Sequence, residues 1–146
     1  MNRQIRLELL LIAPFLLGVC TASAGASLVV VMNTNSNVDS LTREEVINIF
    51  LGRFRQLPNG QAALPIDQSQ DPELQADYYQ RHDNKNPAEI RAYWSRIVFS
   101  GKTSPPYQAK SDQDSLQWLL GTPGGVGYMR SDARPPQLKA IFTLEP

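Results

Sequence analysis

The chain has 146 residues, and its 14 lysine and arginine residues balance its 14 aspartate and glutamate residues. This length is sufficient for one domain with one hydrophobic core. The even balance excludes the strongly basic composition that is typical of nucleic-acid-binding proteins, and there is no acidic tail. The single cysteine, Cys20, excludes a disulfide framework within the chain.

The first 24 residues have the composition of a secretory signal peptide. A basic start, an apolar run at residues 9–19 and small residues at 22–24 follow one another in the typical order. The run is too short to span a bilayer comfortably, and no later apolar stretch is long enough to do so. We therefore expect cleavage after Ala24 and a periplasmic mature domain of residues 25–146. An uncleaved anchor and a lipid-modified Cys20 are the alternatives.

The first elements of the mature domain are predicted to be a strand and a helix. Residues 27–32 are apolar and rich in β-branched side chains, which indicates a buried strand, and residues 33–37 form a polar loop. Thr42 and Glu45 have the spacing of a capping box at the start of a helix. Gly52 can adopt the left-handed conformation that ends it. The buried stripe of this helix is predicted to be Val46, Ile49 and Phe50.

Two further helices are predicted to begin with one and the same pair of residue types, an N-cap residue followed by proline. Asp71 precedes Pro72 and Asn86 precedes Pro87, so each pair places an N-cap residue before a first-turn proline. Gly101 is expected to end the second of these helices. The apolar residues expected to face the core are Leu74 and Tyr78 in the first, and Ile90, Trp94, Ile97 and Val98 in the second.

The remaining elements complete an alternating pattern of strands and helices. Residues 62–66, 124–129 and 138–144 are predicted to form strands, and Ser111 is predicted to cap a fourth helix. This alternation indicates one α/β domain with a mixed or mostly parallel central sheet flanked by about four helices.

The order of several short segments resembles a known family. The segments are VVVMN (29–33), IFLGR (49–53), LPID (64–67), AYWSRIVFSG (92–101) and GGVGYM (124–129). In this order they resemble the phosphate ABC transporter substrate-binding proteins of the type II periplasmic binding protein group, and most closely their short single-lobe members. The resemblance covers roughly residues 28–131. It implies one lobe of that fold, and phosphate or another small oxyanion as the ligand.

Two features of the sequence indicate that phosphate affinity is weak or absent. The chain is long enough for only one lobe, whereas full-length family members close two lobes on their ligand. The stretch that matches the family's ligand loop, residues 67–73, contains neither arginine nor glycine, and Asp71 would itself accept the N–H groups that an anion needs. The candidate ligand-binding residues are Asn33, Thr34, Asp67, Ser69, Gln70 and Asp71.

The alternative function is that of an interaction or regulatory module of the cell envelope. Its open cleft face would then dock on another envelope protein or on a second copy. We expect no enzymatic activity, no cofactor and no metal, because His82 is the only histidine and is expected to be solvated beside Asp83. A carboxylate pair formed by Asp67 with Asp71 or Glu73 is the one catalytic arrangement that the residues leave open.

Overall fold

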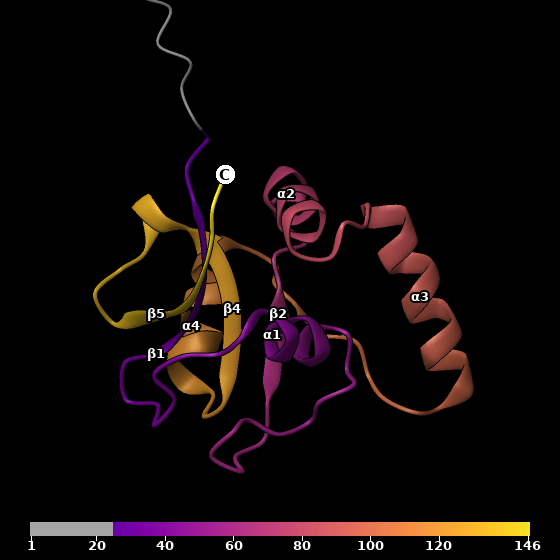
Figure 1. Ribbon diagram of the computed structural model, residues 1–146, viewed down its shortest axis with the longest axis horizontal. Helices are drawn as coiled ribbons and strands as arrows, with labels where there is room; N and C mark the ends of the chain where they lie inside the picture. Colours follow the sequence, from indigo (N-terminus) through magenta and orange to yellow (C-terminus); the bar gives the residue numbers. More distant parts are fainter. Residues whose placement is uncertain (1–24) are drawn as a thin grey trace, which may run out of the picture.

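The computed structural model describes residues 25–146, so the predictions of a signal peptide, its cleavage and its lipidation lie outside the described residues. The strands are β1 (Leu28–Asn33), β2 (Leu64–Asp67), β3 (Tyr107–Gln108), β4 (Gly125–Arg130) and β5 (Leu138–Leu144). The helices are α1 (Arg43–Phe50), α2 (Pro72–Asp83), α3 (Pro87–Ser100), α4 (Asp112–Gly121) and the short 3-10 helix η1 (Ser131–Ala133). Figure 1 shows their arrangement.

The five strands form one sheet in the order β3-β2-β4-β1-β5. β2 is parallel to both β3 and β4, whereas β1 is antiparallel to β4 and to β5. Four strands therefore run in one direction and β1 runs in the other. The prediction of a mixed, mostly parallel sheet with helices is confirmed.

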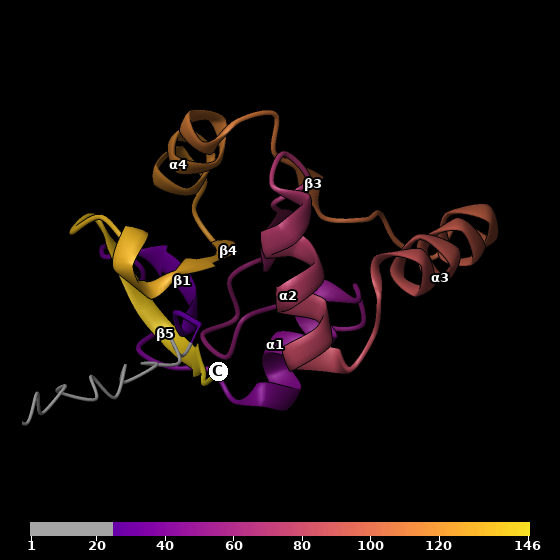
Figure 2. The ribbon, with the colours of Figure 1, turned by 90° about the horizontal axis from the view of Figure 1, so that it is seen from above.

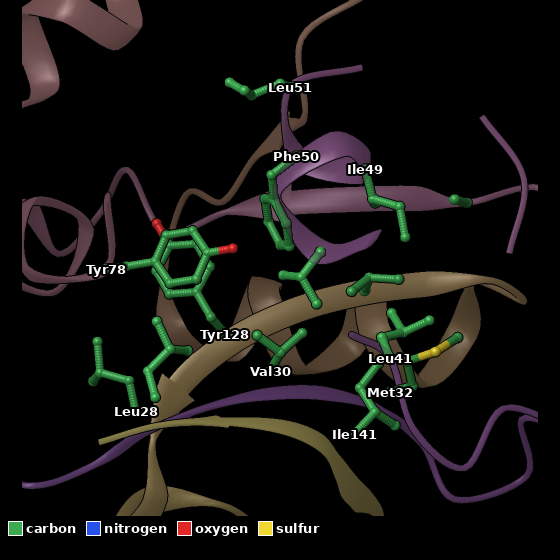
Figure 3. Packing of buried hydrophobic residues seen from close by; sticks show 14 of the residues in the cluster. Leu28, Val30, Met32, Leu41, Ile49, Phe50, Leu51, Tyr78, Tyr128 and Ile141 are labelled. Atoms are coloured by element: carbon green, nitrogen blue, oxygen red, sulfur yellow. The ribbon is translucent and has the colours of Figure 1, made fainter. Parts of the chain in front are cut away.

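Helices cover both faces of the sheet because successive side chains of β1 point to opposite sides. Val30 and Met32 pack in one cluster with Phe50 of α1 and Tyr78 of α2, as Figure 3 shows. Val29 and Val31 belong to a second cluster, which includes Leu119 of α4. Residues 25–146 thus contain the whole sheet and both hydrophobic clusters, and we expect this unit to fold by itself.

The predicted helix starts are confirmed in atomic detail. Thr42 and Asn86 each form a capping box with a glutamate three residues later, and Asp71 and Ser111 accept hydrogen bonds from the first turns of α2 and α4. The predicted end at Gly101 is also confirmed, since this glycine has a φ of 70°. Local sequence signals therefore determine where these four helices begin and where α3 ends.

Helix α3 departs from the prediction that its whole apolar stripe is buried. Ile90 and Trp94 are buried, but Val98 is 53% exposed and the neighbouring Phe99 is 96% exposed. Both ribbon views place α3 at the end of the molecule that is farthest from β5 (Figures 1 and 2), and the partly buried Ile97 still packs against the core. The last turn of α3, with Val98 and Phe99, therefore lacks a covering element among the described residues.

The prediction that His82 is solvated is wrong. Its side chain is only 2% exposed and packs between Tyr78 and Phe142. Burial, together with the nearby guanidinium of Arg43, lowers the pKa of His82 to about 4. The imidazole is therefore a neutral part of the core at neutral pH.

Candidate binding site

The carboxyl ends of β2, β3 and β4 meet at one edge of the sheet because these strands run parallel. In open α/β sheets, ligands bind in the crevice at this edge. A hollow of about 290 Å³ lies there, at the starts of α2 and α4, and we call it the carboxyl-edge hollow. Its polar lining consists of Gln68, Asp71, Asp112, Ser115 and Arg130, and its apolar lining includes Leu74, Leu116 and Met129.

An arginine that is not among the predicted ligand residues reaches this hollow from the end of a predicted strand. Arg130 is the last residue of β4, and its Nη1 donates to Asp71 Oδ2 at 3.0 Å. The other carboxylate oxygen of Asp71 accepts the backbone N–H of Leu74, which caps α2. This backbone hydrogen bond lowers the pKa of Asp71, and so does the pairing with Arg130. Arg130 thus supplies the guanidinium that residues 67–73 lack, but this guanidinium is already paired with Asp71.

Two glutamines connect the starts of α2 and α4. Gln68 is buried, and its Nε2 donates to Ser115 Oγ and to the carbonyl oxygen of Tyr128, both at 2.9 Å. Gln70 Nε2 donates to Gln68 Oε1 at 2.6 Å and to Asp112 Oδ1 at 3.0 Å. These side-chain amide donors are therefore used within the protein, and the loop between β2 and α2 is held in place.

The charges around the hollow disfavour an anion. Asp71 and Asp112 line it, and Glu73 lies in the first turn of α2, against the single guanidinium of Arg130. Two like charges about 4 Å apart repel by about 4 kcal/mol at an effective dielectric of about 20, and solvent screening reduces this at partly exposed groups. The helix dipoles favour an anion here, but Asp71 and Ser111 already cap both helices.

Asp67, a predicted ligand residue, lies in a closed hydrogen-bond network. Its carboxylate is 4% exposed and accepts hydrogen bonds from Tyr79 Oη at 3.2 Å, from Gln75 Nε2 at 2.9 Å and from Tyr128 Oη. Burial raises the pKa of both tyrosines, and the Asp67 charge raises it further. Asp67 thus joins side chains of α2 and β4 by hydrogen bonds inside the protein, and it does not line the carboxyl-edge hollow.

Ser69 and Asp67 lie on a different hollow from Asp71. Both line a groove of about 540 Å³ between α2, α3 and β3. Ser69 Oγ donates to the carbonyl oxygen of Ala109 at 3.0 Å, which ties the loop after β2 to the loop after β3. The carboxylates of Asp67 and Asp71 therefore face different hollows, an arrangement that does not favour their use as a catalytic pair.

Asn33 and Thr34 lie at the opposite end of the sheet, because β1 runs antiparallel to β4. Asn33 Nδ2 donates to the carbonyl oxygen of Leu120, and its Oδ1 accepts the backbone N–H of Asn35. Asn33 lines a smaller hollow of about 240 Å³, whereas Thr34 is exposed outside it. The length of β1, about 20 Å at the usual rise per residue, separates these two residues from Asp71. The six predicted ligand residues thus form separate groups.

Metal ligands are not gathered anywhere in the described part of the chain. Residues 25–146 contain no group of three or more histidine, cysteine, aspartate or glutamate side chains that could hold a metal ion. Within the same residues, no helix is both long and apolar enough to cross a membrane.

Comparisons with known proteins support the fold. No protein-family model and no curated protein matches the chain. A solved structure of a phosphate ABC transporter substrate-binding protein with bound phosphate from Clostridium perfringens matches 80% of this chain and 45% of its own, with a TM-score of 0.58 and 12% identity. An ABC-type phosphate transport receptor from Vibrio cholerae matches 81% of this chain and 47% of its own, with a TM-score of 0.52 and 14% identity. The chain therefore spans less than half the length of either structure, and its fold resembles part of a phosphate ABC transporter substrate-binding protein.

Proposed function

We propose that this protein is a secreted, periplasmic binding module built as a single lobe of the phosphate-binding-protein fold, and that its ligand binds in the carboxyl-edge hollow. The position of the hollow supports this assignment, because it combines parallel strand ends with two helix starts and the guanidinium of Arg130. The two solved structures with a similar fold are phosphate-transport proteins, which supports phosphate or another small oxyanion as the ligand.

The proposed affinity for phosphate is weak, in the millimolar range or below detection. The observation that carries this proposal is the double role of Asp71, which caps α2 and pairs with Arg130. A phosphate would have to displace this carboxylate from the guanidinium, and it would meet the charges of Asp112 and Glu73. The hollow formed by the described residues is also open to solvent, which weakens every electrostatic contact in it.

A second candidate function is an interaction module of the cell envelope. The observation that favours it is the span of the chain, which matches less than half of each phosphate-binding structure. In that case, another envelope protein or a second copy of the chain would cover the carboxyl-edge hollow and the surface around it.

Calorimetric titration of phosphate into residues 25–146 at low ionic strength tests the proposed affinity. We expect a dissociation constant in the millimolar range or no measurable heat. Micromolar binding by a monomer would contradict the role given to Asp71. Sedimentation of the same sample tests the second candidate, because a stable dimer whose formation is impaired by Arg130→Glu would assign the face to self-association.

A further inference from the structure

Two segments of the chain are basic and contain no acidic residue. Residues 50–66 and 90–111 contain no aspartate or glutamate, although 13 acidic residues occur elsewhere in residues 25–146. They hold six of the twelve basic residues of that range, namely Arg53, Arg55, Arg91, Arg96, Lys102 and Lys110. All six are exposed. The four ion pairs between described residues involve other basic residues, so the charges of these six are not neutralised by ion pairing.

The same two segments carry most of the exposed apolar side chains. Six large hydrophobic residues are exposed in the described part of the chain, and five of them lie in these segments: Phe54, Leu64, Val98, Phe99 and Tyr107. Phe99 is the extreme case at 96% exposure, near the end of α3. Single exposed apolar residues are common in soluble proteins, but several of them among unpaired basic residues indicate a surface for a partner.

The fold brings the two segments together. The guanidinium of Arg55 donates to the carbonyl oxygen of Lys102, and Gly52 lies against the side chains of Trp94 and Thr103. In Figures 1 and 2, α3 stands out from the body at one end of the molecule. We call the outer end of α3 and the loop that follows it, with Arg96, Phe99 and Lys102, the α3 tip.

The shape and chemistry of the α3 tip fit a lipid surface. Arg96 and Phe99 are three residues apart on the helix, so they lie on the same side, and Lys102 follows the turn at Gly101. An exposed aromatic ring flanked by basic residues can enter the boundary between headgroups and acyl chains while the cations contact anionic headgroups. We propose that the α3 tip docks this protein on the surface of a bilayer that contains anionic phospholipid.

A bilayer accounts for the tip better than a second copy of the chain does. A two-fold contact through this surface would place the basic residues of one copy against those of the other, and like charges repel. A bilayer also accepts a protruding apolar side chain without a preformed pocket. This inference does not depend on the proposed ligand, because the α3 tip and the carboxyl-edge hollow share no residue.

Vesicle co-sedimentation tests the proposal. Residues 25–146 are used because the apolar run at residues 9–19 would bind bilayers by itself. We expect binding to vesicles that contain phosphatidylglycerol, weak binding to vesicles of phosphatidylcholine alone, and loss of binding at high salt. Phe99→Ser should weaken binding about tenfold, because the ring no longer leaves water. Arg96→Glu should weaken it about fivefold or more, the effect of about one cation near an anionic surface.

Matched variants elsewhere on the surface provide the controls. Among the described residues, Leu120 is the one exposed large hydrophobic residue outside the two segments, and Leu120→Ser removes it. Arg134→Glu reverses an exposed charge near β5. Both variants should bind vesicles as the wild type does. Equal binding to neutral vesicles, or wild-type binding by both tip variants, would overturn the proposal. Failure to bind any vesicle, together with self-association that Phe99→Ser abolishes, would also overturn it and assign the tip to contacts between copies.

Discussion

The carboxyl-edge hollow and the α3 tip differ in how their side chains are partnered. In the hollow, Asp71 is bonded both to a guanidinium and to a helix N–H, and Gln68 donates two hydrogen bonds within the protein. At the tip, Phe99 is almost fully exposed, and neither Arg96 nor Lys102 forms an ion pair with a described residue. A concave position by itself therefore does not imply strong binding, because groups that are satisfied internally must first be released.

The largest expected effect is on the free energy of unfolding. It distinguishes substitutions in the core near the carboxyl-edge hollow from substitutions at the α3 tip. Tyr78 is fully buried and stacks on Tyr128 with a centroid distance of 3.7 Å, whereas Phe99 is 96% exposed. Tyr78→Ala should lower the free energy of unfolding by about 4 kcal/mol, the usual cost of removing a buried aromatic ring. Phe99→Ala should change it by less than about 0.5 kcal/mol. Urea unfolding measures both, and a large loss in Phe99→Ala would show that an element covers the tip.

The next largest expected effect is a dependence of stability on pH, which arises from the buried His82. Because the pKa of His82 is about 4 in the folded protein and about 6.5 when unfolded, the unfolded chain binds the extra proton between these values. Stability should therefore fall as the pH drops from about 6.5 to about 4, by about 3 kcal/mol in total. Asp83 opposes the shift only in part.

The variant His82→Gln isolates this contribution, because the carboxylates titrate in both proteins. Thermal unfolding of the two proteins across the same pH range should show a steeper loss for the wild type. Parallel curves would mean that His82 is accessible to protons in the folded state, which would contradict its burial.

A matched pair of phenylalanine substitutions tests the hydrogen bonds below the hollow. Tyr128 Oη donates to the buried carboxylate of Asp67, whereas Tyr78 Oη has no partner among the described residues. Tyr128→Phe should lower the free energy of unfolding by about 2 kcal/mol, because it deprives a buried charge of a donor. Tyr78→Phe should be close to neutral. Equal losses in the two variants would contradict the role of Asp67 as the centre of this network.

Much of the fold follows from local signals in the sequence. The caps at Thr42, Asp71, Asn86 and Ser111 act within one helical turn, so they can be identified without knowledge of the fold. Strand β3 was not predicted, because two residues carry no periodic pattern and this strand exists only through its pairing with β2.

The spacing of residues in the sequence indicates that His82 is buried, whereas its polar neighbours suggest that it is exposed. Residues 74, 78 and 82 are spaced four apart, so His82 lies on the same face of α2 as two predicted core residues. Helical periodicity was the better guide here than the charges of Arg81 and Asp83, the residues on either side.

The candidate site was only partly predictable, because its assembly depends on strand direction. The hydrophobic pattern of β1 does not reveal that it runs opposite to β2, so Asn33 was placed in one site with Asp71 although they lie at opposite ends. Arg130 was missed for a related reason. Its position at the end of a predicted strand becomes informative only once that strand is known to lie beside β2 and parallel to it.

The smallest expected effect, about tenfold in affinity, tests the central claim that Asp71 limits anion binding. Asp71→Asn keeps an oxygen that can cap α2 but removes the charge that pairs with Arg130. Calorimetric titration should show phosphate binding about tenfold tighter than in the wild type, equivalent to about 1.4 kcal/mol. The control Asp77→Asn removes a charge from the same helix that is paired with Arg81 instead, and it should change little. Unchanged or weaker phosphate binding in Asp71→Asn would contradict the account.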